Sequence, residues 1–320
     1  MKMPYKQNKK NIFSIAPMMG KTDAFFCMLL NLINKDVNIY TEMIHAETII
    51  RSNVLDNYKK LDNISRVSLQ IAGNNPKTLS KASILAEDIG FKEININCGC
   101  PSPRVLSGEF GISLLEKPQL VAECVNEIKN KVSCEISIKT RIGINYENND
   151  AILDFFLETL NKVEVKKYII HARNAIIKKM SARKNLLIPK LNYERVYRLK
   201  NKFKNNIIII NGGFLNTTEY NNVLRKVDGI MIGREAYKNP WIFDEKHSIG
   251  LNKKKNIVLT YLSILEKRFN NKKFDFKALF HLYNIFNNLA GSKEWKRKIN
   301  SAIKEKSLTC LFNYLRYHKI

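Results

Sequence analysis

Residues 93–101 read EININCGCP, a short β-rich run that ends in an irregular loop of glycine, cysteine and proline. Comparable Ile- and Val-rich runs recur up to about residue 245, and the intervals between them leave room for crossover helices. Buried parallel strands have this composition. The predicted strands are Ile12–Ala16, Asn38–Glu42, Arg66–Ile71, Glu93–Asn97, Glu135–Thr140, Tyr168–Ala172, Ile207–Asn211 and Asp228–Gly233. Eight strands alternating with helices predict a (β/α)8 TIM barrel.

A doubly wound parallel sheet is the alternative fold. The sequence contains neither G-x-G-x-x-G nor G-x-x-x-x-G-K-[ST], the phosphate-binding motifs that would support it. The barrel therefore remains the favoured interpretation.

The pattern becomes purely helical from about residue 251. Apolar residues recur at three- and four-residue spacing in VLTYLSILEKRF, FKALFHLYNIFNNL, KEWKRKINSAI and SLTCLFNYLRY. Gly291-Ser292 separates the second of these segments from the third. We therefore expect two domains, a catalytic barrel in residues 1–245 and a small α-helical bundle in residues 251–320.

Composition indicates a globular protein. Hydrophobic residues make up 45% of the 320 residues, which excludes wholesale disorder. No apolar run approaches the roughly 20 residues of a membrane-spanning helix, and no apolar signal-peptide segment follows the basic start MKMPYKQNKKN. Six scattered cysteines do not form a disulfide framework, and the pair Cys98 and Cys100 lacks the partners of a zinc site. We expect a cytoplasmic protein with no membrane partner and no metal.

The positive charge is concentrated at the carboxyl end. The whole chain has 54 Lys and Arg against 29 Asp and Glu, a net charge of +25, and residues 251–320 alone carry 16 against 4. A gene drifting toward A and T would also be rich in lysine, but drift should spread the charge evenly. The concentration favours a nucleic-acid-binding surface on the helical segment.

Polar residues and tight turns follow nearly every predicted strand, on the face where barrels carry their catalytic residues. They are Pro17, Met18, Glu42, Gln70, Asn97, Cys100, Lys139, His171, Arg173, Asn211-Gly212-Gly213 and Gly233-Arg234. Taken singly, Asn211-Gly212-Gly213 is compatible with a mere tight turn, Lys139 with a surface lysine, His171 with a core histidine and Glu42 with a salt bridge. Together, the glycines and Arg234 offer backbone N–H groups and a guanidinium to one phosphate. Cys100, in an irregular loop, is expected to be accessible as an acid.

Motifs along most of the chain resemble those of one enzyme family. They are IAPMMGKTD, VSLQIAG, ININCGCPSPRV, FGISLL, IKTRIGI, IIHARNA, INGGF and DGIMIGREAYKNPWIF, in order from about residue 11. This set resembles the tRNA-dihydrouridine synthases. SARKN, IPKLNYERVYRLK and GSKEWKRK, which extend the resemblance to about residue 300, are most similar to the bacterial A-type branch, which acts at positions 20 and 20a.

The resemblance implies reduction of the C5=C6 bond of selected tRNA uridines, with FMN as cofactor and NADPH or NADH as the reductant. It implies that flavin N5 delivers a hydride to C6 and that Cys100 donates the proton to C5. It also implies that Lys139 lies beside the flavin ring. The implied cofactor-binding residues are Ala16, Pro17, Met18, Gln70, Lys139, His171, Asn211, Gly212, Gly213, Gly233 and Arg234.

The resemblance also implies contacts to the substrate. Asn97 would orient the target uracil, and Arg173 would face the ring and the substrate. Arg183, Lys293 and Lys296 fall near tRNA-contacting positions of the branch, although each is also compatible with a solvated basic side chain. A target uridine has to leave the base stack to reach the flavin, so a basic bundle that grips the rest of the tRNA fits this chemistry. Relatives of this kind imply a monomer.

Three positions depart from the branch pattern. Leu186 replaces an arginine, Gly20-Lys21 replaces an acidic-aromatic pair, and Cys98 adds a thiol beside the expected acid. Two other functions stay open: reduction of a free pyrimidine or another small enone, and RNA binding by a barrel that has lost its chemistry. Retention of Cys100, Lys139 and His171 argues against the second.

Overall fold

The computed structural model describes residues 11–59, 61–145, 150–177, 181, 184–187, 189–215, 220–244, 249–269 and 275–317. Nine parallel strands form one sheet in the order β2-β1-β9-β8-β7-β6-β5-β4-β3, and an additional β2–β4 pairing closes eight of them into a barrel. The strands are β1 (Ile12–Ile15), β2 (Val37–Tyr40), β3 (Ile44–His45), β4 (Val67–Ala72), β5 (Glu93–Cys98), β6 (Glu135–Arg141), β7 (Lys167–His171), β8 (Ile207–Asn211) and β9 (Gly229–Ile232).

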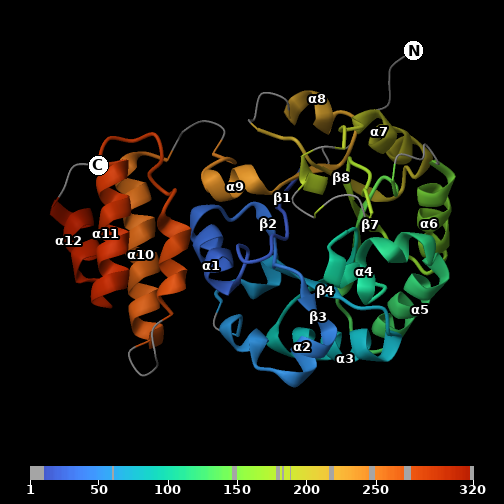
Figure 1. Cartoon of the computed structure of the whole chain (residues 1–320), viewed down its shortest axis with the longest axis horizontal. Coiled ribbons are helices and arrows are strands. Elements are labelled where there is room, and N and C mark those ends of the chain that lie inside the picture. The colour runs from blue at the N-terminus through green and yellow to red at the C-terminus, as the bar shows by residue number, and fades with distance from the viewer. Residues whose placement is uncertain are drawn as a thin grey trace, which may run out of the picture.

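Helices connect the strands and cover the outside of the barrel (Figure 1). The α-helices are α1 (Ala24–Ile33), α2 (Ala46–Arg51), α3 (Pro76–Ile89), α4 (Pro103–Ser107), α5 (Pro118–Lys129), α6 (Asp150–Lys162), α7 (Tyr193–Lys202), α8 (Tyr220–Leu224) and α9 (Arg234–Lys238). Short 3-10 helices are η1 (Val54–Asn57), η2 (Ile64–Arg66), η3 (Gly111–Glu116) and η4 (Lys184–Leu186). The predicted (β/α)8 barrel is confirmed.

All eight predicted strands are present, as β1, β2 and β4–β9, with ends that differ by at most two residues. The two-residue strand β3 was not predicted, because Ile44–His45 is too short to carry a periodic pattern. Among the strands in the described residues, β3 pairs only with β4, through Ile44 with Ile71 and His45 with Ala72. It is therefore an addition at the rim and not a member of the closed barrel.

Two kinds of side chain fill the barrel interior. Ala16, Tyr40, Ile169, Ile209 and Met231 form a small apolar cluster separate from the main core. A row of buried polar residues from β4, β5 and β6 lies in the interior as well: Gln70, Glu93, Asn95, Asn97 and Ser137. Successive side chains of a strand point to opposite faces, so Ile94 and Ile96 of β5 enter the main core between strands and helices.

The described residues after 250 are mainly helical and lie beside α1 and α9 (Figure 1). It consists of α10 (Leu251–Phe269), the 3-10 helix η5 (Phe276–Leu282), α11 (Ser292–Glu305) and α12 (Thr309–Tyr317). Gly291 is the residue before α11, with φ of +79°, so the predicted break at Gly291-Ser292 is present.

The prediction of an α-helix over residues 276–289 was wrong. This segment forms η5 followed by turns with i to i+3 hydrogen bonds, such as Ile285 N–H to the Leu282 carbonyl at 3.2 Å. Side chains take the carbonyls that an α-helix would use: Trp295 Nε1 donates to Leu282, and Trp241 Nε1 to Ile285. The segment is also rich in aromatic residues and asparagine, which are weak helix formers. Tertiary hydrogen bonds therefore override the helical spacing.

The helical segment and the barrel share one hydrophobic core. The main cluster of buried residues includes Phe26 and Leu29 of α1 together with Tyr261 and Leu265 of α10. His281 of η5 is buried at this boundary, with its Nε2 3.0 Å from Oδ1 of Asp23, the residue that caps α1. Apolar packing and polar contacts thus both join the two parts.

Within the described ranges, no helix is both long enough and apolar enough to cross a membrane.

A variant of Trp295 tests how much its side-chain hydrogen bond stabilises the helical segment. Trp295→Phe keeps a buried ring but removes the indole N–H that donates to the Leu282 carbonyl at 2.8 Å. The Leu282 carbonyl keeps the Ile285 N–H at 3.2 Å, so loss of this one buried hydrogen bond should lower the free energy of unfolding by about 0.5–1.5 kcal/mol. Urea unfolding followed by circular dichroism measures this change, with exposed Arg297→Ala on the same helix as the control. Equal losses in the two variants would contradict the proposed importance of this hydrogen bond.

Candidate active site

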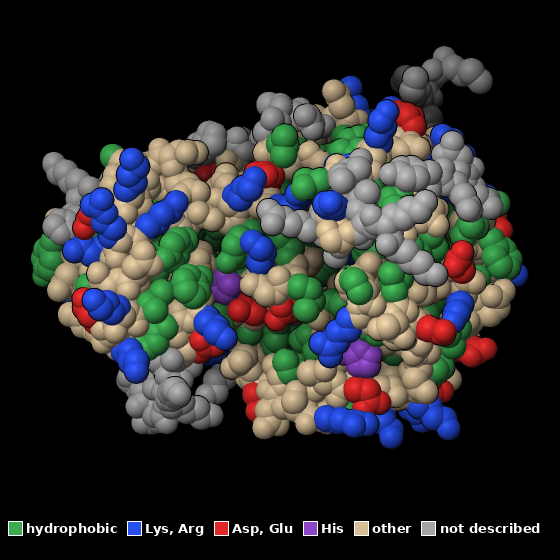
Figure 2. Space-filling model, in the orientation of Figure 1, with side chains coloured by type: hydrophobic (Ala, Val, Ile, Leu, Met, Phe, Trp, Pro, Cys, Tyr) green, Lys and Arg blue, Asp and Glu red, His purple; other side chains and the backbone are tan. Residues whose placement is uncertain are grey.

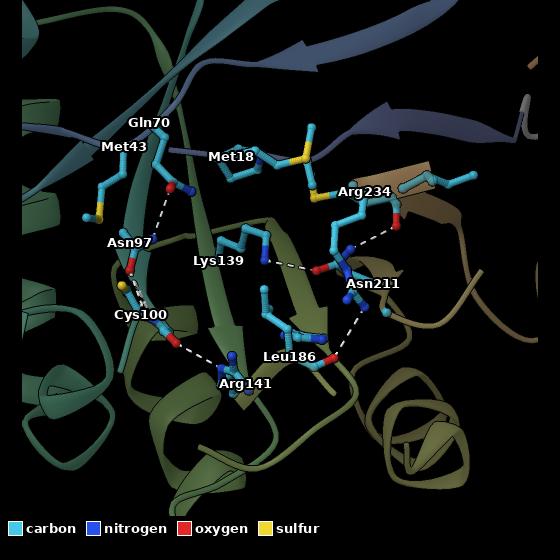
Figure 3. A pocket seen from close by; sticks show the side chains of 18 of the residues that line it. Met18, Met43, Gln70, Asn97, Cys100, Lys139, Arg141, Leu186, Asn211 and Arg234 are labelled. Atoms are coloured by element: carbon cyan, nitrogen blue, oxygen red, sulfur yellow. Dashed lines mark hydrogen bonds between the residues drawn. The ribbon is translucent and has the colours of Figure 1, made fainter. Parts of the chain in front are cut away.

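A cavity of about 430 Å³ opens at the carboxyl ends of the barrel strands. Thirteen residues singled out from the sequence line it: Ala16, Pro17, Met18, Gln70, Asn97, Cys100, Lys139, His171, Asn211, Gly212, Gly213, Gly233 and Arg234. In Figure 3, Gln70, Asn97 and Cys100 lie on one side of the cavity, Asn211 and Arg234 on the other, and Lys139 between them. Segments from β1 to β9 therefore converge on one site.

Cys100 lies in the loop after β5, half-buried at the wall of the cavity. Asn97 holds this loop through its side-chain Oδ1, which accepts from the backbone N–H groups of Gly99 and Cys100 at 3.2 and 3.0 Å. The Cys100 thiol donates to Ser102 Oγ at 3.5 Å. The loop thus presents a thiol to the cavity from a fixed backbone.

Cys98, the second thiol of this segment, points the other way. It is fully buried in the main core, and burial raises the pKa of its thiol well above the usual range. Because Cys98 is two residues before Cys100 and still on the strand, the two thiols occupy different environments. Cys98 is therefore unsuited to proton donation in the cavity.

The Lys139 side chain comes from β6, which lies between β5 and β7, and it lines the cavity. Its Nζ donates to Asn211 Oδ1 at 3.1 Å, and Asn211 Nδ2 donates to the Met231 carbonyl at 2.9 Å. Burial, reinforced by neighbouring Arg141, lowers the pKa of Lys139 to about 7. This amine therefore changes charge near neutral pH, and a negative group beside it would favour the protonated form.

Arg141 is a lining residue that the sequence analysis did not single out. Its Nε donates to the Gly99 carbonyl at 3.0 Å, and its Nη1 to the carbonyls of Asn174 and Asn185, both at 3.1 Å. It therefore connects the Cys100 loop with two segments that follow β7. Alternation offered a signal, because Arg141 is two residues after Lys139 and faces the same side of β6.

His171 is buried against the glycine turn after β8. Burial and the cations Arg141, Lys139, Arg173 and Arg234 lower the pKa of His171 well below its usual value, so the imidazole is neutral at pH 7. A β-carbon on Gly212 would lie 2.7 Å from His171 Cδ2, and one on Gly213 2.3 Å from Leu191 Cδ1. Both glycines have positive φ, +116° and +82°, so only glycine fits this turn without strain.

Positive charge accumulates at the mouth of the cavity near this turn. Arg234 Nη2 donates to the Leu186 carbonyl at 3.4 Å, and partial burial together with the Arg234 charge lowers the pKa of Arg173. Arg173 Nη1 donates to the carbonyls of Leu187 and Pro189, while its buried Nε has no hydrogen-bond partner in the described part of the chain. Among the described lining residues the one carboxylate belongs to Glu235, which pairs with Lys238 at 2.8 Å. The site is therefore built for an anion.

Four predicted substrate contacts are not among the lining residues. Arg173 is bound to the carbonyls of Leu187 and Pro189, and Arg183 lies outside the described residues. Lys293 and Lys296 are on α11 of the helical segment, where Figure 2 shows many Lys and Arg side chains on the face in view. The cavity and the basic surface on α11 are therefore two different regions of the molecule.

Two of the positions that depart from the branch pattern, Lys21 and Leu186, are at the cavity, whereas Cys98 is in the core. Leu186 lines the cavity, and Lys21 lines it with Nζ 3.8 Å above the Tyr237 ring. Gly20 N–H donates to Glu42 Oε2 at 2.6 Å, so Glu42 supports the loop after β1. Met43 and Leu215 also line the cavity, and no sequence motif distinguished these apolar side chains.

Comparisons with known proteins show the family and the fold. A family model described as dihydrouridine synthase matches residues 14–315. A tRNA-dihydrouridine(20/20a) synthase of Synechocystis is 35% identical over 302 residues, covering 91% of this chain and 89% of the relative, and that of Salmonella typhimurium is 35% identical over 295 residues, covering 90% and 89%. Among solved structures, histamine dehydrogenase from Rhizobium sp. 4-9 shares the fold with a TM-score of 0.54 and 13% identity, over 78% of this chain and 49% of that one. This chain is a member of the dihydrouridine synthase family.

Proposed function

We propose that this enzyme reduces uridine to 5,6-dihydrouridine at position 20, and also at 20a, in the D-loop of tRNA. FMN is the proposed cofactor, and NADPH or NADH the reductant. The observation that carries the proposal is a cavity lined by a thiol, a half-buried lysine and a glycine turn with an arginine beside it, in a chain about 35% identical to synthases named for these positions. We propose that it works in the cytoplasm as a monomer.

The lining residues fit FMN by size, shape and charge. The cavity volume of about 430 Å³ lies in the range of cofactor sites. Gly212 and Gly213 leave a recess that β-carbons would fill, and Arg234 is the cation beside it, so this corner is the proposed phosphate site. Ala16, Pro17, Met18 and Gln70 would contact the ring.

When bound and reduced, FMN supplies the hydride that adds to C6 of the uracil. The protein has to supply the proton for C5, and the proposed donor is the Cys100 thiol, which leaves a thiolate that takes a proton back from water. Lys139, held by Asn211, would stabilise negative charge beside it, and neutral His171 avoids repelling the neighbouring cations. Asn97 would orient both the uracil and the Cys100 loop.

The helical segment is the proposed tRNA-binding domain, so the proposed division is residues 1–245 and 251–320. Residues 251–320 carry 16 Lys and Arg against 4 Asp and Glu. A surface of this charge binds phosphate groups without reading the base sequence. Lys293 and Lys296 are proposed phosphate contacts on α11, and Arg173 and Arg183 are proposed contacts nearer the cavity.

One experiment separates this function from reduction of a free pyrimidine and from RNA binding alone. The purified protein is reduced anaerobically with NADPH, and flavin absorbance is followed after addition of tRNA that lacks dihydrouridine. We expect rapid reoxidation with tRNA and none with free uridine. Reoxidation by uridine alone would favour a small-molecule reductase, and folded protein that takes up no flavin would favour RNA binding.

Two cysteine variants test the proton donor. Cys100→Ala should lower turnover about 10²- to 10⁴-fold, because a positioned acid contributes that much to a rate. FMN content and tRNA affinity should stay unchanged. Cys98→Ala is the matched control, since this thiol is in the core, and its turnover should match the wild type. Mass spectrometry of nucleosides from the tRNA measures the product, and full activity of Cys100→Ala would exclude this thiol as the acid.

Lys139 gives FMN binding a pH dependence. Its amine has a pKa of about 7 in the ligand-free cavity. An anion bound nearby raises that pKa, so binding takes up a proton above pH 7, and FMN affinity should fall between pH 7 and 9 by up to about tenfold per unit. FMN phosphate, with a second pKa of about 6, stays dianionic over this range. Fluorescence titration measures the affinity; Lys139→Met should remove the slope, and an equal slope in that variant would contradict the assignment.

A further inference from the structure

A continuous row of hydrogen-bonded side chains runs through the barrel interior to the Cys100 loop. We call it the polar column: Glu93, Ser137, Asn95, Gln70 and Asn97. Ser137 Oγ donates to Glu93 Oε1 at 2.5 Å, Asn95 Nδ2 to Ser137 Oγ at 2.7 Å, Gln70 Nε2 to Asn95 Oδ1 at 2.7 Å, and Asn97 Nδ2 to Gln70 Oε1 at 2.9 Å. The last of these bonds is drawn in Figure 3.

Glu93 anchors the column at the end away from the cavity. Its Oε1 also accepts from Tyr40 OH at 2.8 Å, and its Oε2 accepts from Lys167 Nζ at 3.0 Å. Lys167 in turn pairs with Glu135 at 2.6 Å. A carboxylate that is paired with an ammonium group accepts hydrogen bonds and donates none.

Because the Glu93 carboxylate can only accept, every hydrogen bond of the polar column has a fixed donor and a fixed acceptor. Because Glu93 only accepts, the Ser137 hydroxyl has to donate to it, and its lone pair is left to accept from an Asn95 NH₂. Asn95 then turns its carbonyl toward Gln70, and Gln70 turns its carbonyl toward Asn97. A reversed amide at any link would set oxygen against an acceptor on one side and NH₂ against N–H on the other, which leaves buried donors and acceptors unpaired.

This directed chain of hydrogen bonds ends at the loop that carries Cys100. Since Asn97 gives its NH₂ to Gln70, its Oδ1 is free to accept from the backbone N–H groups of Gly99 and Cys100. An Asn97 turned the other way would present NH₂ to two N–H groups and release the loop. Gln70 and Asn97 both line the cavity, so the same direction also fixes which of their atoms face a ligand.

We propose that Glu93 and Ser137 are positioning residues for the active site, which fix the amide direction of Asn97 through the polar column and thereby hold the Cys100 loop. Neither residue lines the cavity. The proposal rests on the proposed function only in taking Cys100 as the proton donor, because the effect on the loop itself can be measured without catalysis.

Two hydroxyl deletions separate this role from general packing. Ser137→Ala and Tyr40→Phe each remove one buried hydroxyl that donates to Glu93 Oε1. Only Ser137 stands between Glu93 and the amides, so only Ser137→Ala interrupts the column. The two variants should lose similar amounts of thermal stability. Glu93→Gln is a third variant, since an amide in place of this carboxylate can turn either its oxygen or its NH₂ toward Ser137.

Hydrogen–deuterium exchange of the FMN-bound protein reads the loop directly. In Ser137→Ala and Glu93→Gln the amides of Gly99 and Cys100, in a peptide covering residues 98–104, should exchange roughly three- to tenfold faster, because loss of the hydrogen bonds lets the loop open. Tyr40→Phe should exchange there as the wild type does. Steady-state kinetics should show a lower kcat with unchanged KM for tRNA in the first two variants.

Each outcome decides one question. Equal exchange at residues 99 and 100 in Ser137→Ala and Tyr40→Phe would overturn the positioning role and leave the column as interior packing. Faster exchange without any change in kcat would support the control of the loop but contradict Cys100 as the proton donor. Faster exchange together with lower kcat, against an unaffected Tyr40→Phe, is the result that we expect.

Discussion

The parallel pairing of the barrel strands brings the ends of eight strands to one rim, and the cavity depends on this constraint. Lys139, His171 and Asn211 are 72 residues apart at most, yet adjacent strands pair Lys139 with Ile169 and His171 with Asn211. Each of these side chains reaches the cavity because it is close to the carboxyl end of its strand. An antiparallel neighbour would send its last residues to the opposite rim.

Neutral acceptors hold most of the cations around the cavity. Asn211 Oδ1 binds Lys139, backbone carbonyls bind Arg141 and Arg173, and the Leu186 carbonyl binds Arg234. A carbonyl satisfies a guanidinium N–H without cancelling its charge. The site therefore keeps its positive potential, whereas the ion pair of Lys167 and Glu93 at the other end of the barrel neutralises its charges. This contrast separates the end that receives a ligand from the end that stabilises the fold.

The sequence was most informative where one strand repeats a local pattern, and least where distant segments decide the outcome. Ile-rich strands and the residues that end them located the barrel and thirteen of the cavity residues. Residues 276–289 have helical spacing, but Trp241 and Trp295 take their carbonyls, and no local pattern shows that. Arg141 was within reach of the alternation rule. The direction of the polar column was not, because it arises from Glu93, Ser137 and Gln70 on three different strands.

The shared core between the barrel and the helical segment affects which part of a long ligand can reach the cavity. Phe26 and Leu29 pack in one cluster with Tyr261 and Leu265, and His281 contacts Asp23 across the boundary. A shared core of this kind opposes hinge motion, so we expect the separation between the basic surface and the cavity to vary little. An RNA gripped on the helices would offer the cavity only the nucleotide at that separation. The protein would then select a base by its distance from the part of the folded RNA that is bound to the helices.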